Sequence, residues 1–117
     1  MTIQECYEKM GGDYADVVSR LRTDERIQRF LLKVADDKSF AELESSLKAH
    51  DIPTAFRAAH TLKGVCLNLS ITRLYKSASA MTEELRGKTE YSPAYEQMLE
   101  KVREDYELTV SCIKAIG

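Results

Sequence analysis

Residues 58–70 read AAHTLKGVCLNLS and contain a histidine and a glycine one helical turn apart, His60 and Gly64. On a wheel of about 100° per residue, the apolar residues around them fall on one side, which predicts an amphipathic helix from about residue 53 to residue 69. The expected core stripe of this helix is Ala55, Ala59, Leu62, Cys66 and Leu69. His60 and Gly64 lie toward solvent instead. A glycine in a helix interior costs about 1 kcal/mol relative to alanine, and one use for it here is to let another molecule approach the imidazole.

The residues around His60 leave few kinds of chemistry open to it. Cys66 lies roughly 240° around the same helix, so the two side chains cannot form a Cys–His dyad. His50, the other histidine, lies at another expected helix end, and no spacing of histidines and carboxylates predicts a metal site. A neutral imidazole is nevertheless a nucleophile near neutral pH. Lys63, three residues further on, would favour the neutral ring and offset the charge of a phosphoryl group attached to it.

Start and stop signals divide the rest of the chain into further helices. Two capping boxes, Thr2 with Glu5 and Ser39 with Glu42, predict helix starts. The other expected helix starts are Asp13, Thr23, Asp51, Ser70 and Ser92 followed by Pro93, and the glycines at 11, 12 and 87 are expected helix ends. Apolar spacing predicts the buried sides of two more helices. These sides are Ile27, Phe30, Leu31 and Val34 in one, and Met98, Leu99, Val102, Tyr106, Val110 and Ile113 in the last.

Short connections between helices of similar length favour antiparallel neighbours. We therefore expect an all-α fold: an antiparallel up-and-down four-helix bundle with additional short N-terminal helices, in a single domain over residues 1–117. A net charge of −2 without a basic run argues against nucleic-acid binding. The apolar stretches are too short to cross a membrane. The absence of an export signal and the three scattered cysteines (Cys6, Cys66 and Cys112) lead us to expect reduced, buried thiols in a cytoplasmic protein.

The stretch AAHTLKG, followed by LNLSITRLYKSASAMTEELR, resembles the histidine-containing phosphotransfer (HPt) domains of bacterial phosphorelays and the phosphoacceptor domain of chemotaxis kinases. The family pattern is an alanine-flanked histidine with a lysine at +3 and a glycine at +4. Those positions are Ala59, His60, Lys63 and Gly64 here. The resemblance extends over roughly residues 24–115, because an acidic residue opens the histidine helix and amphipathic helices flank it on both sides.

The resemblance implies a role for each residue of the motif. His60 would accept a phosphoryl group from a receiver-domain aspartate or a histidine kinase and pass it to another receiver, without kinase activity of its own. Lys63 would provide charge support, and Gly64 would leave the opening for the receiver. On the helical wheel, Phe56 and Leu67 flank the ring, where each either docks the partner or packs under a neighbouring helix. Arg57 is a further candidate for docking, and the alternative for it is a solvated charge on the helix surface. The chain would hold no metal, because the Mg²⁺ of the reaction is expected from the partner receiver or kinase.

Some family members place a glutamate on the following helix, where it hydrogen-bonds the second nitrogen of the histidine. The aligned position in this chain is Thr82, with Glu83 and Glu84 next to it. We expect a free-standing monomer whose partners are a response-regulator receiver domain and a histidine kinase. The alternative function is that of a helical adaptor that binds a protein partner without phosphoryl chemistry. Both functions predict the same bundle, and they differ in whether His60 is an accessible nucleophile.

Overall fold

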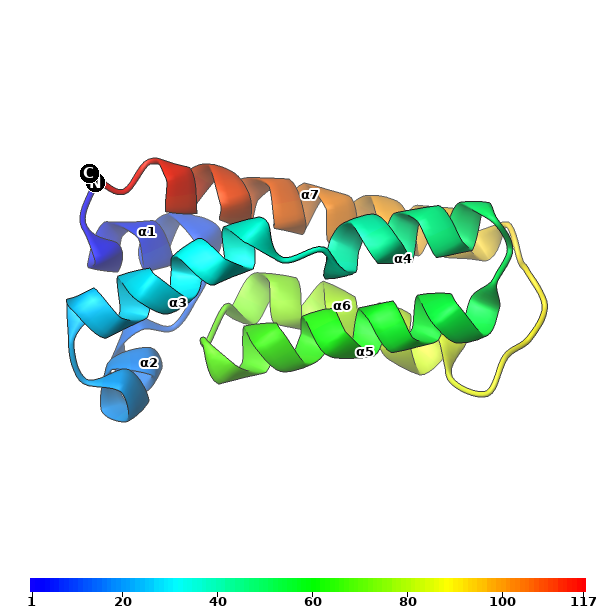
Figure 1. Cartoon of the computed structure of the whole chain (residues 1–117), viewed down its shortest axis with the longest axis horizontal. Helices are drawn as coiled ribbons and strands as arrows, with labels where there is room; N and C mark the ends of the chain where they lie inside the picture. Colours follow the sequence, from blue (N-terminus) through cyan, green and yellow to red (C-terminus); the bar gives the residue numbers. More distant parts are fainter.

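The computed structural model describes all 117 residues and contains seven helices and no strand (Figure 1). The helices are α1 (Ile3–Met10), α2 (Tyr14–Leu21), α3 (Asp24–Asp36), α4 (Ser39–Lys48), α5 (Ile52–Asn68), α6 (Thr72–Leu85) and α7 (Ala94–Lys114). The all-α prediction is confirmed. Each of the seven helices that the start and stop signals indicate is present, with ends that shift by one or two residues.

The helices form a four-rod antiparallel bundle (Figure 1). One rod is α3 followed by α4, and the other three are α5, α6 and α7. The histidine helix α5 packs against α4 and α6, and α6 packs against α7. The short helices α1 and α2 lie at one end of the bundle. This arrangement confirms the predicted four-helix bundle with additional short N-terminal helices.

The two ends of the chain meet at the end of the bundle where α1 begins (Figure 1). The N-terminal ammonium of Met1 donates to the backbone carbonyl of Ala115 at 3.1 Å. The amide of Gly117 donates in return to the carbonyl of Met1 at 3.3 Å.

Side-chain caps start most of the helices. The capping box at Thr2 and Glu5 is complete: the Thr2 hydroxyl accepts from the Glu5 amide at 3.1 Å, and the Glu5 carboxylate accepts from the Thr2 amide at 2.9 Å. Asp13, Thr23 and Asp51 each accept a hydrogen bond from the amide three residues further on. Local sequence therefore fixes these four starts, because each cap needs only residues of its own first turn.

Two predicted caps are wrong, and a third predicted start is displaced by one residue, since Pro93 rather than Ser92 holds the cap position of α7. Ser39 is the first residue of α4 rather than its cap; Lys38 precedes it without a capping side chain, and the Asp37 carboxylate accepts from the Ser39 amide at 2.8 Å. Ser70 does not cap α6 either, since Ile71 holds the cap position and makes no side-chain cap bond. Ser70 has a left-handed backbone, with φ at +56°, and its hydroxyl bonds to residues of α2 instead.

One continuous hydrophobic core joins all seven helices, from Ile3 in α1 to Ile113 in α7. The predicted stripe of α5 is fully confirmed, because all five of its residues are buried. Phe30 is a correction: its three predicted companions on α3 are buried, but the Phe30 side chain is 42% exposed. On α7, Leu99, Val102 and Ile113 are buried, and Met98, Tyr106 and Val110 are half-buried.

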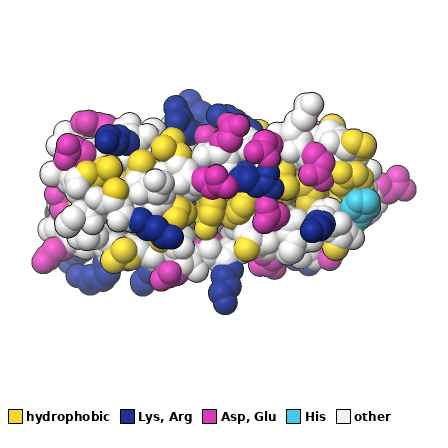
Figure 2. Space-filling model, turned by 90° about the horizontal axis from the view of Figure 1, so that it is seen from above, with side chains coloured by type: hydrophobic (Ala, Val, Ile, Leu, Met, Phe, Trp, Pro, Cys, Tyr) yellow, Lys and Arg dark blue, Asp and Glu magenta, His cyan; other side chains and the backbone are white.

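The three cysteines are unpaired and buried, as predicted. None of the helices combines the length and the apolar composition that crossing a membrane requires. On the face shown in Figure 2, basic and acidic side chains are interspersed, with hydrophobic side chains visible between them. This face therefore offers no large patch of a single charge.

Candidate functional site

The histidine helix presents His60 to solvent near its middle. Asp51 starts α5 by accepting from the Thr54 amide at 3.2 Å, and Pro53 occupies the first turn, where its missing amide hydrogen costs nothing. Burial of the α5 stripe then fixes the rotation of the helix about its axis. His60 is exposed as a result, as the helical wheel predicts.

Gly64 leaves open space one turn beyond His60. A Cβ atom built at Gly64 would have no atom within 4 Å, whereas one at Gly12 would lie 2.7 Å from the Tyr7 ring. No packing inside this chain therefore requires a glycine at Gly64. The expectation that Gly64 faces open space is confirmed, and its role as the opening for a receiver stays a prediction.

The apolar residues proposed to flank the ring differ in their exposure. Leu67 is 57% exposed, so it is available to a partner. Phe56 is half-buried and packs against the core. Its ring meets the His60 ring edge to face, with centroids 5.9 Å apart and an angle of 78° between the planes. Phe56 therefore supports the imidazole from the side and is only partly available for docking.

Arg57 is exposed beside the site, and its side chain makes a hydrogen bond within α5. Its guanidinium donates to the Thr54 hydroxyl at 3.0 Å, and that hydroxyl donates to Asp51 at 2.7 Å. This local chain of hydrogen bonds holds Arg57 along α5. The structure thus places Arg57 on the same helix as His60, one turn toward the start of the helix.

Lys63 is held by an acidic residue of α6 that the sequence interpretation does not single out. The Lys63 ammonium lies 3.8 Å from the Glu83 carboxylate. Glu83 also accepts two hydrogen bonds from the Arg86 guanidinium, at 3.0 and 3.1 Å. Hydrogen bonding from Arg86 is the main cause of the lowered pKa of Glu83, and the positive charges of Arg86 and Lys63 add to it.

Arg86 connects this ion pair back to the ring of the histidine. Its guanidinium carbon lies 5.1 Å from the centroid of the Phe56 ring, a cation–π distance. Phe56 in turn contacts His60. Glu83 and Arg86 lie three residues apart at the carboxyl end of α6, and this spacing is a local signal of an ion pair. The closeness of the ion pair to His60 depends on how α5 packs on α6.

Thr82 does not take the place of the glutamate found in some family members. Its side chain is fully buried, and its hydroxyl donates to the Ala78 carbonyl at 2.7 Å. Thr82 therefore faces the core rather than His60. The carboxylate that approaches the site belongs to the next residue, Glu83.

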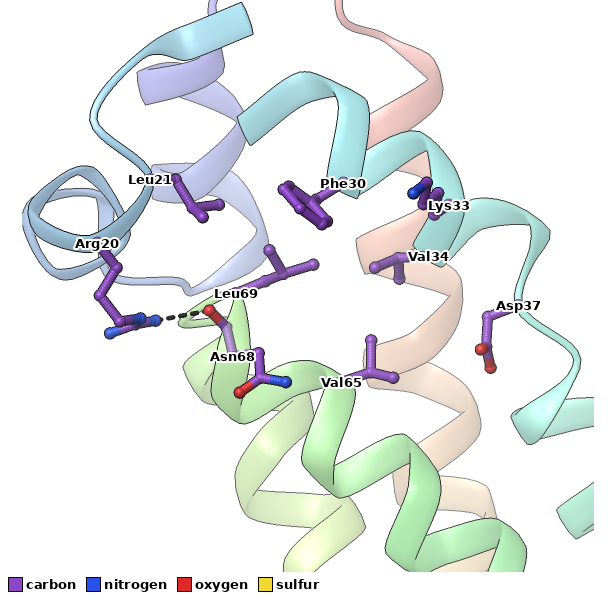
Figure 3. Close-up of a pocket in the computed structure, with 9 residues that line it drawn as sticks. All are labelled: Arg20, Leu21, Phe30, Lys33, Val34, Asp37, Val65, Asn68 and Leu69. Carbon is purple, nitrogen blue, oxygen red and sulfur yellow. Dashed lines mark hydrogen bonds between the residues drawn. The ribbon is translucent and has the colours of Figure 1, made fainter. Parts of the chain in front are cut away.

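Side chains of the N-terminal helices α1 and α2 form hydrogen bonds with the carboxyl end of α5. The hydroxyl of Tyr7 donates to the Leu69 carbonyl at 2.8 Å. Arg20 donates to the Asn68 carbonyl at 2.7 Å, as Figure 3 shows, and to the Ser70 hydroxyl at 2.6 Å. The last carbonyls of a helix lack partners within the helix, so these donors from α1 and α2 stabilise the end of the histidine helix.

An apolar pocket of about 450 Å³ lies between α2, α3 and this end of α5 (Figure 3). Phe30, Val34, Val65 and Leu69 point into it, and Arg20 and Lys33 lie at its edge. The Lys33 ammonium lies 5.3 Å from the centroid of the Phe30 ring. This pocket explains why Phe30 is exposed: α3 turns it toward a groove that no other helix fills.

The remaining reactive side chains lie apart from His60. His50 follows α4 and stacks on Tyr91, with ring centroids 3.8 Å apart. Burial raises the pKa of the Cys66 thiol to about 12, which leaves it protonated and a poor nucleophile. The structure contains no group of three or more histidine, cysteine or acidic side chains placed to hold a metal ion.

The comparisons with known proteins give one match. Residues 27–111 match the family model described as Hpt domain, which covers most of the chain. No curated protein matches the chain, and no solved structure does.

Proposed function

Because the chain belongs to the Hpt domain family, we propose that it is a phosphorelay intermediate that accepts a phosphoryl group on His60. It would pass this group to or from an aspartate of a response-regulator receiver domain. Hpt domains are phosphocarrier modules of two-component signalling and are not kinases. The observation that carries the proposal is the exposed imidazole of His60 beside the open position of Gly64.

The proposed step is an in-line transfer between two proteins. The unprotonated nitrogen of the His60 ring donates its lone pair to the phosphorus of an aspartyl phosphate. The N–P bond forms as the P–O bond to the aspartate breaks, and the electron pair of that bond leaves with the carboxylate. The other ring nitrogen keeps its proton, so the ring carries the positive charge that the aspartate carboxylate balances.

The chain's own residues serve this step by position and charge. Phe56 supports the ring at its edge, and Gly64 leaves room for the receiver to bring its phosphoryl group in line. Lys63 offsets negative charge at the acceptor. Leu67 and the accessible part of Phe56 offer apolar contacts to the docked partner. The partner supplies the Mg²⁺ and the remaining stabilisation of the transition state.

The setting that we propose follows from the same family. The donors and acceptors are a histidine kinase and receiver domains, and the exchange takes place in the cytoplasm on a monomeric protein. Nucleic acid has no part in it. The alternative function, a helical adaptor without phosphoryl chemistry, requires no reactivity at His60.

A transfer assay tests the proposal. The protein is incubated with radiolabelled phosphorylated receivers from the same cell, and the label is followed on gels after acid and alkali treatment. We expect label that is acid-labile and alkali-stable in the wild type and in His50→Gln, but none in His60→Gln. Both histidines are exposed, so neither substitution leaves a cavity in the core. Label that persists in His60→Gln, or no label from any receiver, would favour the adaptor.

A further inference from the structure

One carboxylate forms ion pairs with both cations next to the proposed phosphorylation site. Glu83 binds Arg86 through two hydrogen bonds and lies 3.8 Å from the Lys63 ammonium. Lys63 is three residues from His60 on α5, and Arg86 lies over the ring of Phe56, which contacts His60. Lys63 and Arg86 make no other ion pair within the chain.

This arrangement sets the local charge before and after phosphorylation. Without a phosphoryl group, two positive charges and one negative charge surround the ring. A phosphoryl group on His60 brings about two negative charges next to Glu83, against the one positive charge that the ring gains. Glu83 then repels the phosphoryl group and competes with it for the two cations. Removing the carboxylate would leave Lys63 and Arg86 free to bind the phosphoryl oxygens.

We propose that Glu83 is a positioning residue that destabilises the phosphorylated form of His60 by holding Lys63 and Arg86, and so favours onward transfer of the phosphoryl group to the receiver. The inference rests on the proposed function, since it concerns the energy of the phosphohistidine. It assigns Glu83 no contact with the reacting atoms. Its effect is on the equilibrium between phosphohistidine and phosphoaspartate, in which an N–P bond replaces a P–O bond and the aspartate carboxylate is released.

The test compares Glu83→Gln with Glu84→Gln. Both substitutions remove one negative charge from neighbouring exposed positions of α6, but only Glu83 pairs with Lys63 and Arg86. Each variant is brought to equilibrium with a phosphorylated receiver, and the label on the two proteins is measured. We expect Glu83→Gln to shift the equilibrium toward phosphohistidine by roughly two- to fivefold at low salt, as exposed ion pairs allow. The shift should shrink as salt is added.

A second variant tests whether the freed Arg86 guanidinium contributes to the shift. In Glu83→Gln with Arg86→Gln, the shift should fall back toward the wild-type value, because one of the two freed cations is gone. An equal shift in Glu84→Gln would overturn the inference, since it would show a general effect of net charge. An unchanged equilibrium in Glu83→Gln would overturn it as well.

Failure of the proposed function would look different. In that case neither the wild type nor any variant would carry label on His60. If the wild type is labelled and only the Glu83 shift is missing, the phosphorelay role stands and the role of Glu83 does not. Circular dichroism and urea unfolding of each variant separate these outcomes from a loss of folding.

Discussion

The hydroxyl of Tyr7 in α1 donates a 2.8 Å hydrogen bond to the backbone carbonyl of Leu69, just beyond the histidine helix. Tyr7 is fully buried, and burial raises the pKa of its hydroxyl well above the ordinary value. The bond joins two segments that lie 62 positions apart in the chain. It makes α1 part of the structure that holds α5, although α1 lies outside the residues that match the family model.

Replacing Tyr7 by phenylalanine should therefore destabilise the protein. The substitution leaves the Leu69 carbonyl without its buried donor, which costs about 1–3 kcal/mol. Urea unfolding followed by circular dichroism measures the change in the free energy of unfolding. Tyr14→Phe is the matched control, because the Tyr14 hydroxyl bonds to the exposed Asp24 carboxylate. Equal losses in both variants would contradict the role assigned to the Tyr7 hydrogen bond.

Gly64→Ala should stabilise the fold. Alanine is a better helix former than glycine by about 1 kcal/mol, and a Cβ atom at Gly64 meets no other atom. Gly12→Ala should do the opposite, because its Cβ atom would lie 2.7 Å from the Tyr7 ring and 2.9 Å from the Ser70 carbonyl. Thermal unfolding measures the change in melting temperature of each variant.

A larger side chain at Gly64 should separate folding from transfer. We expect Gly64→Glu to keep the folded state and to lose phosphoryl transfer with the receiver, because the side chain fills the space beside His60 and adds negative charge. Transfer at the wild-type rate in a folded Gly64→Glu protein would show that the receiver approaches from another side.

Ser70 should respond differently to glycine and to alanine. Both substitutions remove the hydroxyl that donates to Asp16 and accepts from Arg20. Only glycine also relieves the left-handed backbone at φ +56°, which costs other residues about 1–2 kcal/mol. We expect Ser70→Gly to be more stable than Ser70→Ala by about 1 kcal/mol in urea unfolding. A less stable glycine variant would mean that the backbone at this turn is unstrained.

The contact between α2 and the end of α5 should weaken in acid. The hydrogen bonds from Ser70 and Arg20 lower the pKa of Asp16. A carboxyl whose pKa is lower in the folded state stabilises that state above its unfolded pKa, and the contribution is lost as the pH falls through the folded pKa. As the pH falls below the ordinary carboxyl pKa, the wild type should therefore lose stability more steeply than Asp16→Asn. If the free energy of unfolding of the two proteins falls in parallel with pH, Asp16 makes no net contribution to stability.

Much of the fold could be predicted from the sequence because its signals are local. Thr2, Asp13, Thr23 and Asp51 cap helices through their own first turns, and these starts are all found. The wheel of α5 also predicts correctly that His60 faces solvent, because the periodicity of buried residues fixes the rotation of a helix.

The errors concern residues whose partners come from distant parts of the chain. Serine is a residue type typical of caps, but the Ser70 hydroxyl bonds to Asp16 and Arg20, which lie 54 and 50 positions away in the chain. Glu83 lies beside the site only because α6 packs on α5, a relationship that no local pattern of α6 contains. Phe30 fits the helical spacing of a core residue, but the groove that it faces exists only once α2, α3 and α5 are assembled.

The meeting of Met1 with Ala115 and Gly117 makes the backbone almost a closed ring. A short peptide could join the two ends, and the chain could then be opened in the exposed stretch between α6 and α7 without cutting a helix. The same geometry would let this bundle be spliced into a surface loop of a host protein, because its two attachment points lie side by side and would not force the host's loop apart.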